Sequence, residues 1–204
     1  MKAATQGTAS VLRVGAARAA VFVAVAVPFA LAASSPLLAW RDWIYIAAGF
    51  AGVAALGLLL VQPLVISDAL GLDGMRKRRV HRIVGATLVA LVVLHVGGLW
   101  ITSPPDVVDA LLFTSATRFS AWGVIAMSAL FAAAGLAIVR RRLRYRTWQR
   151  AHLSLVVVVV AATIPHALLI EGTMETISKV ALCALVAAAT AWAVWRVMIR
   201  RGAA

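Results

Sequence analysis

Long apolar runs alternate with short polar segments along most of the chain. A helix of about 20 residues rises about 30 Å, which is enough to cross the hydrocarbon core of a bilayer. Runs of about this length, separated by charged or proline-containing segments, lie at residues 19–33, 43–66, 80–101, 119–139, 151–170 and 177–199. The pattern therefore predicts an all-α, polytopic membrane protein, a bundle of six transmembrane helices.

The N-terminal part of the chain is the least regular. Residues 1–18 are rich in Ala, Thr and Ser with a few basic side chains, so we expect a poorly ordered cytoplasmic tail. The first apolar run is short and contains Pro28, and Ala30-Leu31-Ala32 is similar to a signal-peptidase site. Cleavage of this segment is therefore an alternative to a first membrane span.

The distribution of basic residues predicts an orientation. The chain has 20 Lys and Arg residues against 7 Asp and Glu residues, a net charge of +13 in a sequence that is 63% apolar. All of these cations except Arg41, Arg118 and Lys179 fall on one side of the predicted bundle, so both termini should be cytoplasmic. Because they sit between apolar runs rather than on an amphipathic surface, we expect the lipid bilayer, and no nucleic acid, as partner.

The 4 histidines of the sequence all occur in two matched pairs. His81 and His95 lie in the third run, His152 and His166 lie in the fifth, and fourteen residues separate the members of each pair. Fourteen helical residues rise about 21 Å and end about 40° short of four full turns, so both rings share a face near opposite membrane surfaces. Since the third and fifth helices run in parallel, His81 should face His152 and His95 should face His166.

Imidazoles that face each other across a helix bundle suit a haem iron held from both sides. Four matched histidines are harder to explain as interhelical hydrogen bonds, and the two rings on one helix are too far apart for one zinc or copper ion. A proton relay would need acidic residues within the apolar runs, which have none. A single cysteine, Cys183, excludes an intramolecular disulfide and a covalent CxxCH haem site.

Small residues near the histidines fit a flat macrocycle. Gly85, Gly98 and Ala162 each lie about one turn from a histidine, where clearance is needed. Leu88 and Val159 lie midway between the histidines on the same face, so we expect no aromatic side chain of these helices between the two haems.

Two motifs of the sequence resemble the ferric-reductase-like transmembrane domain family. They are Val80-His81-Arg82-Ile83-Val84-Gly85, with His95 following, and Tyr145-Arg146-Thr147-Trp148-Gln149-Arg150-Ala151-His152, with His166 following. The family includes ferric reductases, NADPH oxidases and the haem-binding membrane subunit of bacterial methionine sulfoxide reductase systems, and the resemblance covers residues 43–199. It implies two haem b groups, one ligated by His81 and His152 and the other by His95 and His166.

The resemblance also implies an oxidoreductase membrane component that transfers electrons to an acceptor on the outer side. Ferric reductases and oxidases continue into flavin and NADPH domains, whereas this sequence stops at Ala204. We therefore expect the flavin or quinone to come from a partner, either a separate cytoplasmic flavoprotein reductase or a membrane quinol. The basic segments 76–82 and 140–150 are candidates for docking an acidic donor.

Arginines near the ends of the runs are candidates for contacts with haem propionates. We expect Arg82 and Arg150 to serve on the cytoplasmic side and Arg118 on the outer side, where Trp100 and Trp122 are expected to line the pocket. The predicted organisation is the tail followed by a six-helix haem-binding domain over residues 19–200, in a bacterial inner membrane or a plasma membrane.

Two other functional classes stay open. The cytochrome b of quinol-oxidising complexes also places two histidine pairs about fourteen residues apart on two helices, so a quinol-linked subunit is the first alternative. The second alternative is a non-redox transporter or assembly protein.

Overall fold

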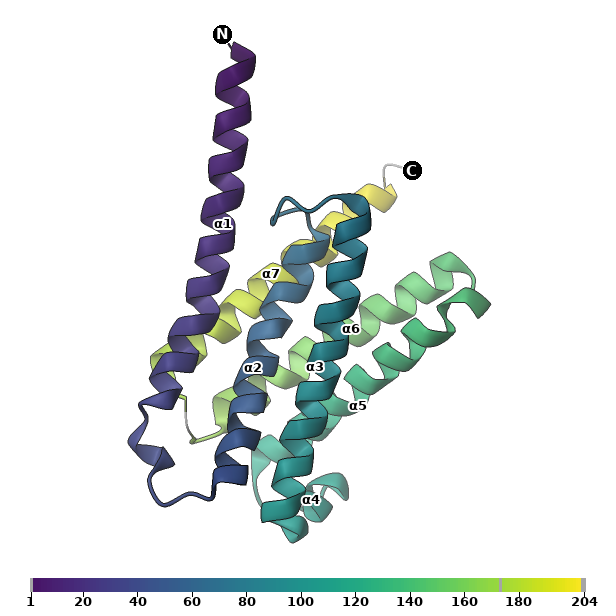
Figure 1. Cartoon of the computed structure of the whole chain (residues 1–204). Helices are drawn as coiled ribbons and strands as arrows, with labels where there is room; N and C mark the ends of the chain where they lie inside the picture. Colours follow the sequence, from purple (N-terminus) through teal and green to yellow (C-terminus); the bar gives the residue numbers. More distant parts are fainter. Residues whose placement is uncertain (1, 173, 203–204) are drawn as a thin grey trace.

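The part of the chain that the computed structural model describes, residues 2–172 and 174–202, is helical throughout apart from connecting turns (Figure 1). The long helices are α1 (Lys2–Ala33), α2 (Trp43–Ile66), α3 (Gly74–Thr102), α5 (Arg118–Ile138), α6 (Tyr145–Leu169) and α7 (Thr176–Gly202). A shorter helix, α4 (Pro104–Leu111), and two 3₁₀ turns, η1 (Pro36–Leu38) and η2 (Val139–Arg142), complete the described elements. All 6 long helices contain a stretch long and apolar enough to cross a membrane, so the predicted all-α bundle is confirmed.

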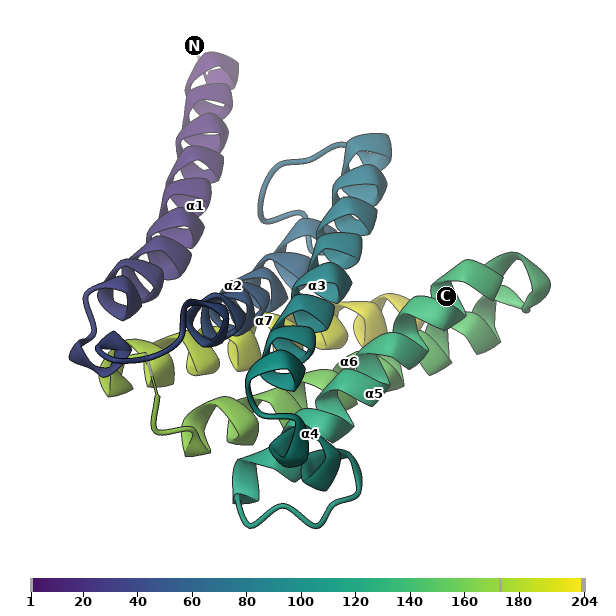
Figure 2. The same ribbon diagram turned by 60° about the horizontal axis from the view of Figure 1, so that its bottom comes forward.

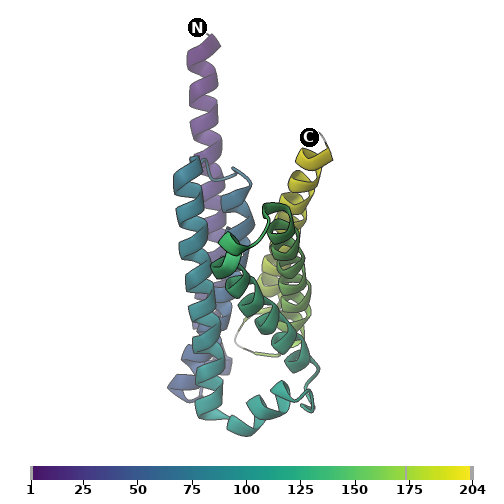
Figure 3. The same cartoon turned by 90° about the vertical axis from the view of Figure 1, so that its right-hand side faces the viewer.

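The helices form two layers, which Figure 3 shows side by side. One layer holds α1, α2 and α3, with α2 packed along α3, and the other holds α5, α6 and α7, with α5 packed along α6. Helix α7 also packs against α2 and so joins the layers. Helix α4 crosses from one layer to the other between α3 and α5 (Figure 2).

The two ends of the bundle differ in charge. The N-terminal end of α1, the C-terminal end of α7, the α2–α3 connection and the α5–α6 connection lie at the same end (Figure 1). We call this end the basic face, because it holds the basic segments 76–82 and 140–150. The other end, which holds α4 and the α6–α7 connection, is called the opposite face.

Polar residues set the beginnings of the two helices that pack together in the first layer. Asp42 accepts a hydrogen bond from the backbone N–H of Ile44 at 2.7 Å, and Asp73 accepts one from Arg76 at 2.9 Å. Such N-caps satisfy backbone donors that the first helical turn leaves free. Because α3 begins directly after Asp73, its first turns carry the basic segment 76–82.

Apolar side chains occupy both the interior and the lipid-facing surface. Leu56, Leu60, Leu182 and Val186 belong to the buried core, whereas large apolar side chains on α3 such as Leu94 stay exposed. A soluble domain rarely exposes so many large apolar residues, but a bilayer solvates them. The protein is a multi-pass membrane protein.

The structure differs from the sequence-based expectation at several helix boundaries. Helix α3 begins at Gly74 rather than at residue 80, and α6 begins at Tyr145 rather than at residue 151. Residues 2–18 belong to α1 rather than to an irregular tail, because their Ala-rich sequence favours a helix and contains no proline. Residues 104–111 form α4 instead of a loop, because Pro104 and Pro105 stand in the first helical turn, where their missing N–H groups cost nothing.

The α2–α3 connection is fastened by helices from both layers. The guanidinium of Arg18 in α1 donates two hydrogen bonds to the carbonyl of Leu70, at 2.9 and 3.1 Å. Arg196 in α7 donates one to the carbonyl of Ser67 at 2.6 Å. Some basic-face arginines therefore have a structural role, in addition to any effect on orientation.

Candidate functional site

The four histidines form two pairs between the layers. The rings of His81 in α3 and His152 in α6 have centroids 6.4 Å apart and planes at 77°. The rings of His95 in α3 and His166 in α6 also have centroids 6.4 Å apart, with planes at 81°. The structure thus brings together the pairs that parallel third and fifth spans require.

The spacing within each pair leaves room for one metal ion. Two metal–nitrogen bonds of about 2 Å, with about 1 Å from each nitrogen to its ring centroid, give a centroid separation of about 6 Å. The observed 6.4 Å agrees with this value. No three His, Cys, Asp or Glu side chains gather among the described residues, so neither pair resembles a zinc site. Two imidazoles would be enough to hold a haem iron, because the porphyrin supplies the other four ligands.

Backbone carbonyls orient the pair nearer the opposite face. The ring of His95 donates an Nδ1–H hydrogen bond to the carbonyl of Ala48 in α2 at 2.7 Å. The ring of His166 makes the same bond to Phe119 in α5 at 2.8 Å. A neutral imidazole that carries its proton on Nδ1 keeps the lone pair of Nε2 for a metal. In the neutral form of both rings, Nε2 is therefore free to bind a metal.

Glycines allow these two rings to lie directly against the neighbouring helix. A Cβ atom on Gly52 would be 3.0 Å from His95 Nδ1, and one on Gly123 would be 2.6 Å from His166 Cε1. Each glycine follows its acceptor carbonyl by four residues and so lies on the same helix face. Any larger residue at these two positions would push the ring away from its carbonyl.

The α2–α3 hairpin and the α5–α6 hairpin repeat one arrangement. Donor and acceptor are 47 residues apart in both hairpins, and each residue of the second set follows its counterpart by 71 positions. The repeat thus includes α2 and α5 as well as the two histidine helices α3 and α6. The matching offset of Gly52 and Gly123 was the signal in the sequence that could have revealed it.

The pair nearer the basic face has different surroundings. The Trp148 ring stacks on the ring of His152, with centroids 5.5 Å apart and planes at 13°, and Arg140 lies over the Trp148 ring at 5.9 Å. The tryptophan of the Tyr-Arg-x-Trp motif therefore covers the basic-face side of His152.

Most of the unpaired polar atoms of the interior lie near this pair. The described residues contain five buried side-chain N or O atoms without a hydrogen-bond partner, and four of them lie at this pair or within about one turn of it: Gln62 Oε1, His81 Nδ1, Trp148 Nε1 and His152 Nδ1.

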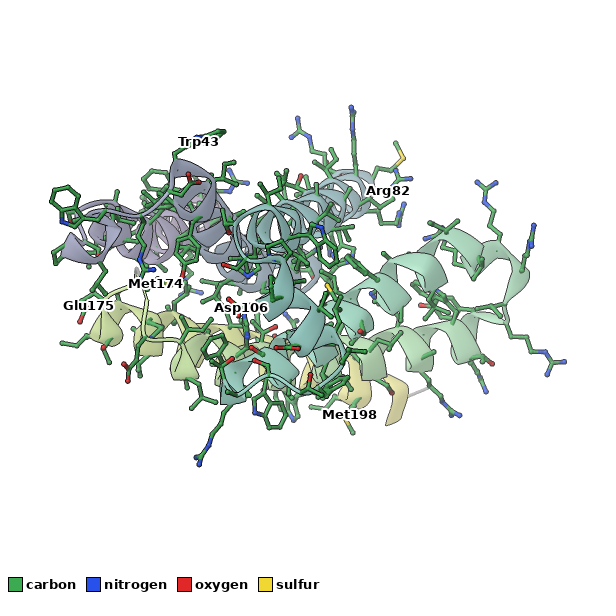
Figure 4. All side chains as sticks on the ribbon, turned by 90° about the horizontal axis from the view of Figure 1, so that it is seen from below. Trp43, Arg82, Asp106, Met174, Glu175 and Met198 are labelled. Carbon is green, nitrogen blue, oxygen red and sulfur yellow. The ribbon has the colours of Figure 1, made fainter. Side chains whose placement is uncertain are left out.

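The three candidate arginines lie at the surface. Arg82, Arg118 and Arg150 are all exposed, and Figure 4 shows Arg82 at the edge of the bundle. Arg79 and Arg82 line a shallow open groove on α3. Trp100 and Trp122 are 47% and 42% exposed. Contacts of these side chains with haem propionates stay predictions.

The small residues of α3 serve helix packing rather than clearance for a macrocycle. A Cβ atom on Gly98 would be 2.7 Å from the Cβ of Ala48, and one on Gly85 would be 2.9 Å from Gln62 Nε2. Both glycines therefore face α2, and they let α2 and α3 approach closely. Leu88 and Val159 are 3% and 5% exposed and belong to the core.

Comparison with known proteins identifies the family. A family model described as ferric reductase like transmembrane component matches residues 47–163, more than half of the chain, including His81, His95 and His152. No characterised protein and no solved structure matched the chain. The family suggests a transmembrane redox function, and its members generally work with a partner dehydrogenase domain or protein. The chain belongs to the ferric reductase like transmembrane component family.

Proposed function

We propose that the chain binds two haem b groups and transfers electrons across the membrane. His81 and His152 would hold one haem, and His95 and His166 the other. Bound haem would supply one-electron redox chemistry. The observation that supports this function best is the two ring pairs, both with centroids 6.4 Å apart, on parallel helices of a ferric-reductase-like domain.

The surrounding residues would prepare the histidines for this role. Carbonyls of Ala48 and Phe119 hold two rings in one tautomer, so little reorganisation is needed when a metal binds. Imidazoles on both sides would leave no open coordination position, so a substrate would react at the edge of the site rather than at the metal. Leu88 and Val159 fill the space between the pairs with buried apolar groups.

The charge distribution supports a cytoplasmic position for the basic face. Short cytoplasmic loops carry an excess of Lys and Arg, and segments 76–82 and 140–150 fit this rule. Both termini and the residue 1–18 segment would then be cytoplasmic. An inside-negative potential would favour outward transfer of an electron by about 2.3 kcal/mol per 100 mV for a full crossing.

The basic face also supports a cytoplasmic flavoprotein as donor. Arg76, Arg78, Arg79 and Arg82 are exposed at the end of α3, and most of segment 140–150 is exposed as well. Such a surface attracts an acidic partner and raises its association rate, an effect that salt screens. The partner dehydrogenases with which the family generally works are consistent with this donor.

A membrane quinol is the second candidate donor. The unpaired Gln62 Oε1 and Trp148 Nε1 lie near the histidine pair of the basic face, where a polar headgroup entering from the membrane would find a donor and an acceptor. A quinol donor would leave the two proposed haem sites unchanged and would alter only the source of electrons.

Single-histidine variants test the proposal. Protein with His81→Ala should lose the same haem as His152→Ala, and His95→Ala the same haem as His166→Ala, as judged by visible spectra and haem content. Gly97→Ala on α3, where a Cβ atom meets nothing within 4 Å, is the matched control that should keep both haems. Loss of the same haem from His81→Ala and His166→Ala would contradict the pairing.

A further inference from the structure

Among residues 11–172 and 174–199, whose side chains the structure describes, Lys179 is the only charged residue that is buried. It is 7% exposed and stands near the start of α7, at the opposite face. Its position continues the buried stripe formed by Leu182, Cys183 and Val186. A lysine near the end of a membrane helix usually extends to the water interface, so this burial needs an explanation.

The charge of Lys179 has no carboxylate partner among the described residues. Its Nζ donates a hydrogen bond to the carbonyl of Ile170 at 2.6 Å. Glu175, four residues earlier, uses its two carboxylate oxygens to accept the backbone N–H groups of Ile177 and Ser178, each at 2.7 Å. Lys179 therefore contacts a carbonyl at the negative end of the α6 dipole rather than a carboxylate.

Lys179 also holds the turn that carries a histidine of the candidate site. Ile170 follows His166 by four residues, about 6 Å along the helix axis. Pro165 lies directly before His166 and has no N–H, so the carbonyl of Ala161 lacks its helical hydrogen bond. The hydrogen bond from Lys179 fixes the C-terminal end of α6, one turn after His166.

The two histidine pairs otherwise belong to equivalent hairpins. Lys179 comes from α7, which lies outside the repeat, so it makes the opposite-face site different from the basic-face site. The arginines of segments 76–82 and 140–150 are exposed, and solvent and salt screen exposed charges. A buried charge acts through a lower dielectric and therefore has the stronger effect on a nearby redox group.

We propose that Lys179 is a positioning and electrostatic residue that raises the reduction potential of the haem at His95 and His166, and so directs electrons toward the opposite face. The physical reason is that reduction adds a negative charge, which a buried cation favours. This inference rests on the proposed function, because it needs a haem at that pair.

Redox titration of the full-length, haem-loaded protein in lipid nanodiscs tests the inference. Lys179→Gln removes the charge and keeps an N–H donor for Ile170, and Lys179→Arg keeps the charge. Arg41→Gln removes an exposed cation at the opposite face, just before the start of α2. The His166→Ala variant identifies which spectral component belongs to the opposite-face haem. Wild-type protein without haem would refute the proposed function itself and is checked first.

We expect Lys179→Gln to lower the midpoint potential of the opposite-face haem and to leave the other haem unchanged. Lys179→Arg and Arg41→Gln should keep the wild-type value. Selective loss of the opposite-face haem from Lys179→Gln, with retention in Lys179→Arg, would also support the inference. An unchanged potential in Lys179→Gln, an equal shift of both haems, or an equal defect in Lys179→Arg would overturn it.

Discussion

Replacing Gly123 with alanine tests how the protein holds His166. The new Cβ atom would lie 2.6 Å from Cε1 and 2.7 Å from Nδ1 of the ring, whereas nonbonded carbon atoms settle at about 3.5–4.0 Å. The ring must therefore move by about 1 Å, and its 2.8 Å hydrogen bond to the carbonyl of Phe119 is lost or lengthened.

The structure sets the scale of the effect. The lost hydrogen bond costs about 1 kcal/mol, and an off-rotamer imidazole costs about another 1 kcal/mol. Alanine in place of glycine returns about 0.5–1 kcal/mol of helix stability. The net loss of about 1–1.5 kcal/mol corresponds to a haem affinity about 5- to 13-fold weaker at the pair of His95 and His166.

The assay is haem release to an excess of apomyoglobin, followed in the visible spectrum. Gly135→Ala is the matched control on the same helix, because its Cβ atom would meet nothing within 4 Å. We expect faster release of one haem from Gly123→Ala and wild-type release from Gly135→Ala. Equal release from both variants would show that the close approach of Gly123 and His166 does not support haem binding.

Three further predictions concern the iron environment, the donor and the start of α7. The nearly perpendicular rings, at 77° and 81°, should give strongly anisotropic low-spin ferric EPR signals, and signals typical of parallel imidazoles would contradict this geometry. Haem reduction by an acidic flavoprotein should slow as salt rises from about 0.1 M to about 1 M, since the screening length falls from about 10 Å to about 3 Å. Reduction by quinol that does not depend on salt would favour the quinol as donor. Hydrogen bonds from Ser178 and Ile177 lower the pKa of Glu175, so its contribution to stability should be present above about pH 4.3 and disappear as the pH falls through the lower folded-state value. Thermal unfolding of Glu175→Gln and of the wild type should therefore converge in acid, and a constant difference at all pH values would contradict the reasoning.

The apolar pattern and the histidine interval predicted much of the architecture because both depend on local geometry. The second predicted span coincides with α2, Trp43–Ile66, where Asp42 caps the helix and the polar residues after Ile66 end it. The pairing of His81 with His152 and of His95 with His166 depends only on helical periodicity and on the direction of α3 and α6. The order of the spans determines that direction.

The remaining features depend on contacts between helices, which a one-dimensional pattern does not contain. Glycine is common in membrane helices, so nothing local distinguished Gly52 and Gly123, which contact histidines, from Gly135, which contacts nothing. The sequence marked Lys179 only as one of three cations on the outer side, because its burial comes from the packing of α7 against α6 and α2. For Gly98 the sequence suggested clearance for a macrocycle, whereas its face of α3 packs against Ala48 of α2.

The haem content of the purified protein tests the central claim most directly. Full-length protein produced with haem available should give two haem b per chain in a pyridine haemochrome assay, with dithionite-reduced spectra typical of low-spin, six-coordinate iron. This result follows from two ring pairs whose centroids are both 6.4 Å apart. Protein that is folded in the membrane and contains no haem would contradict the redox function and would leave the non-redox alternative.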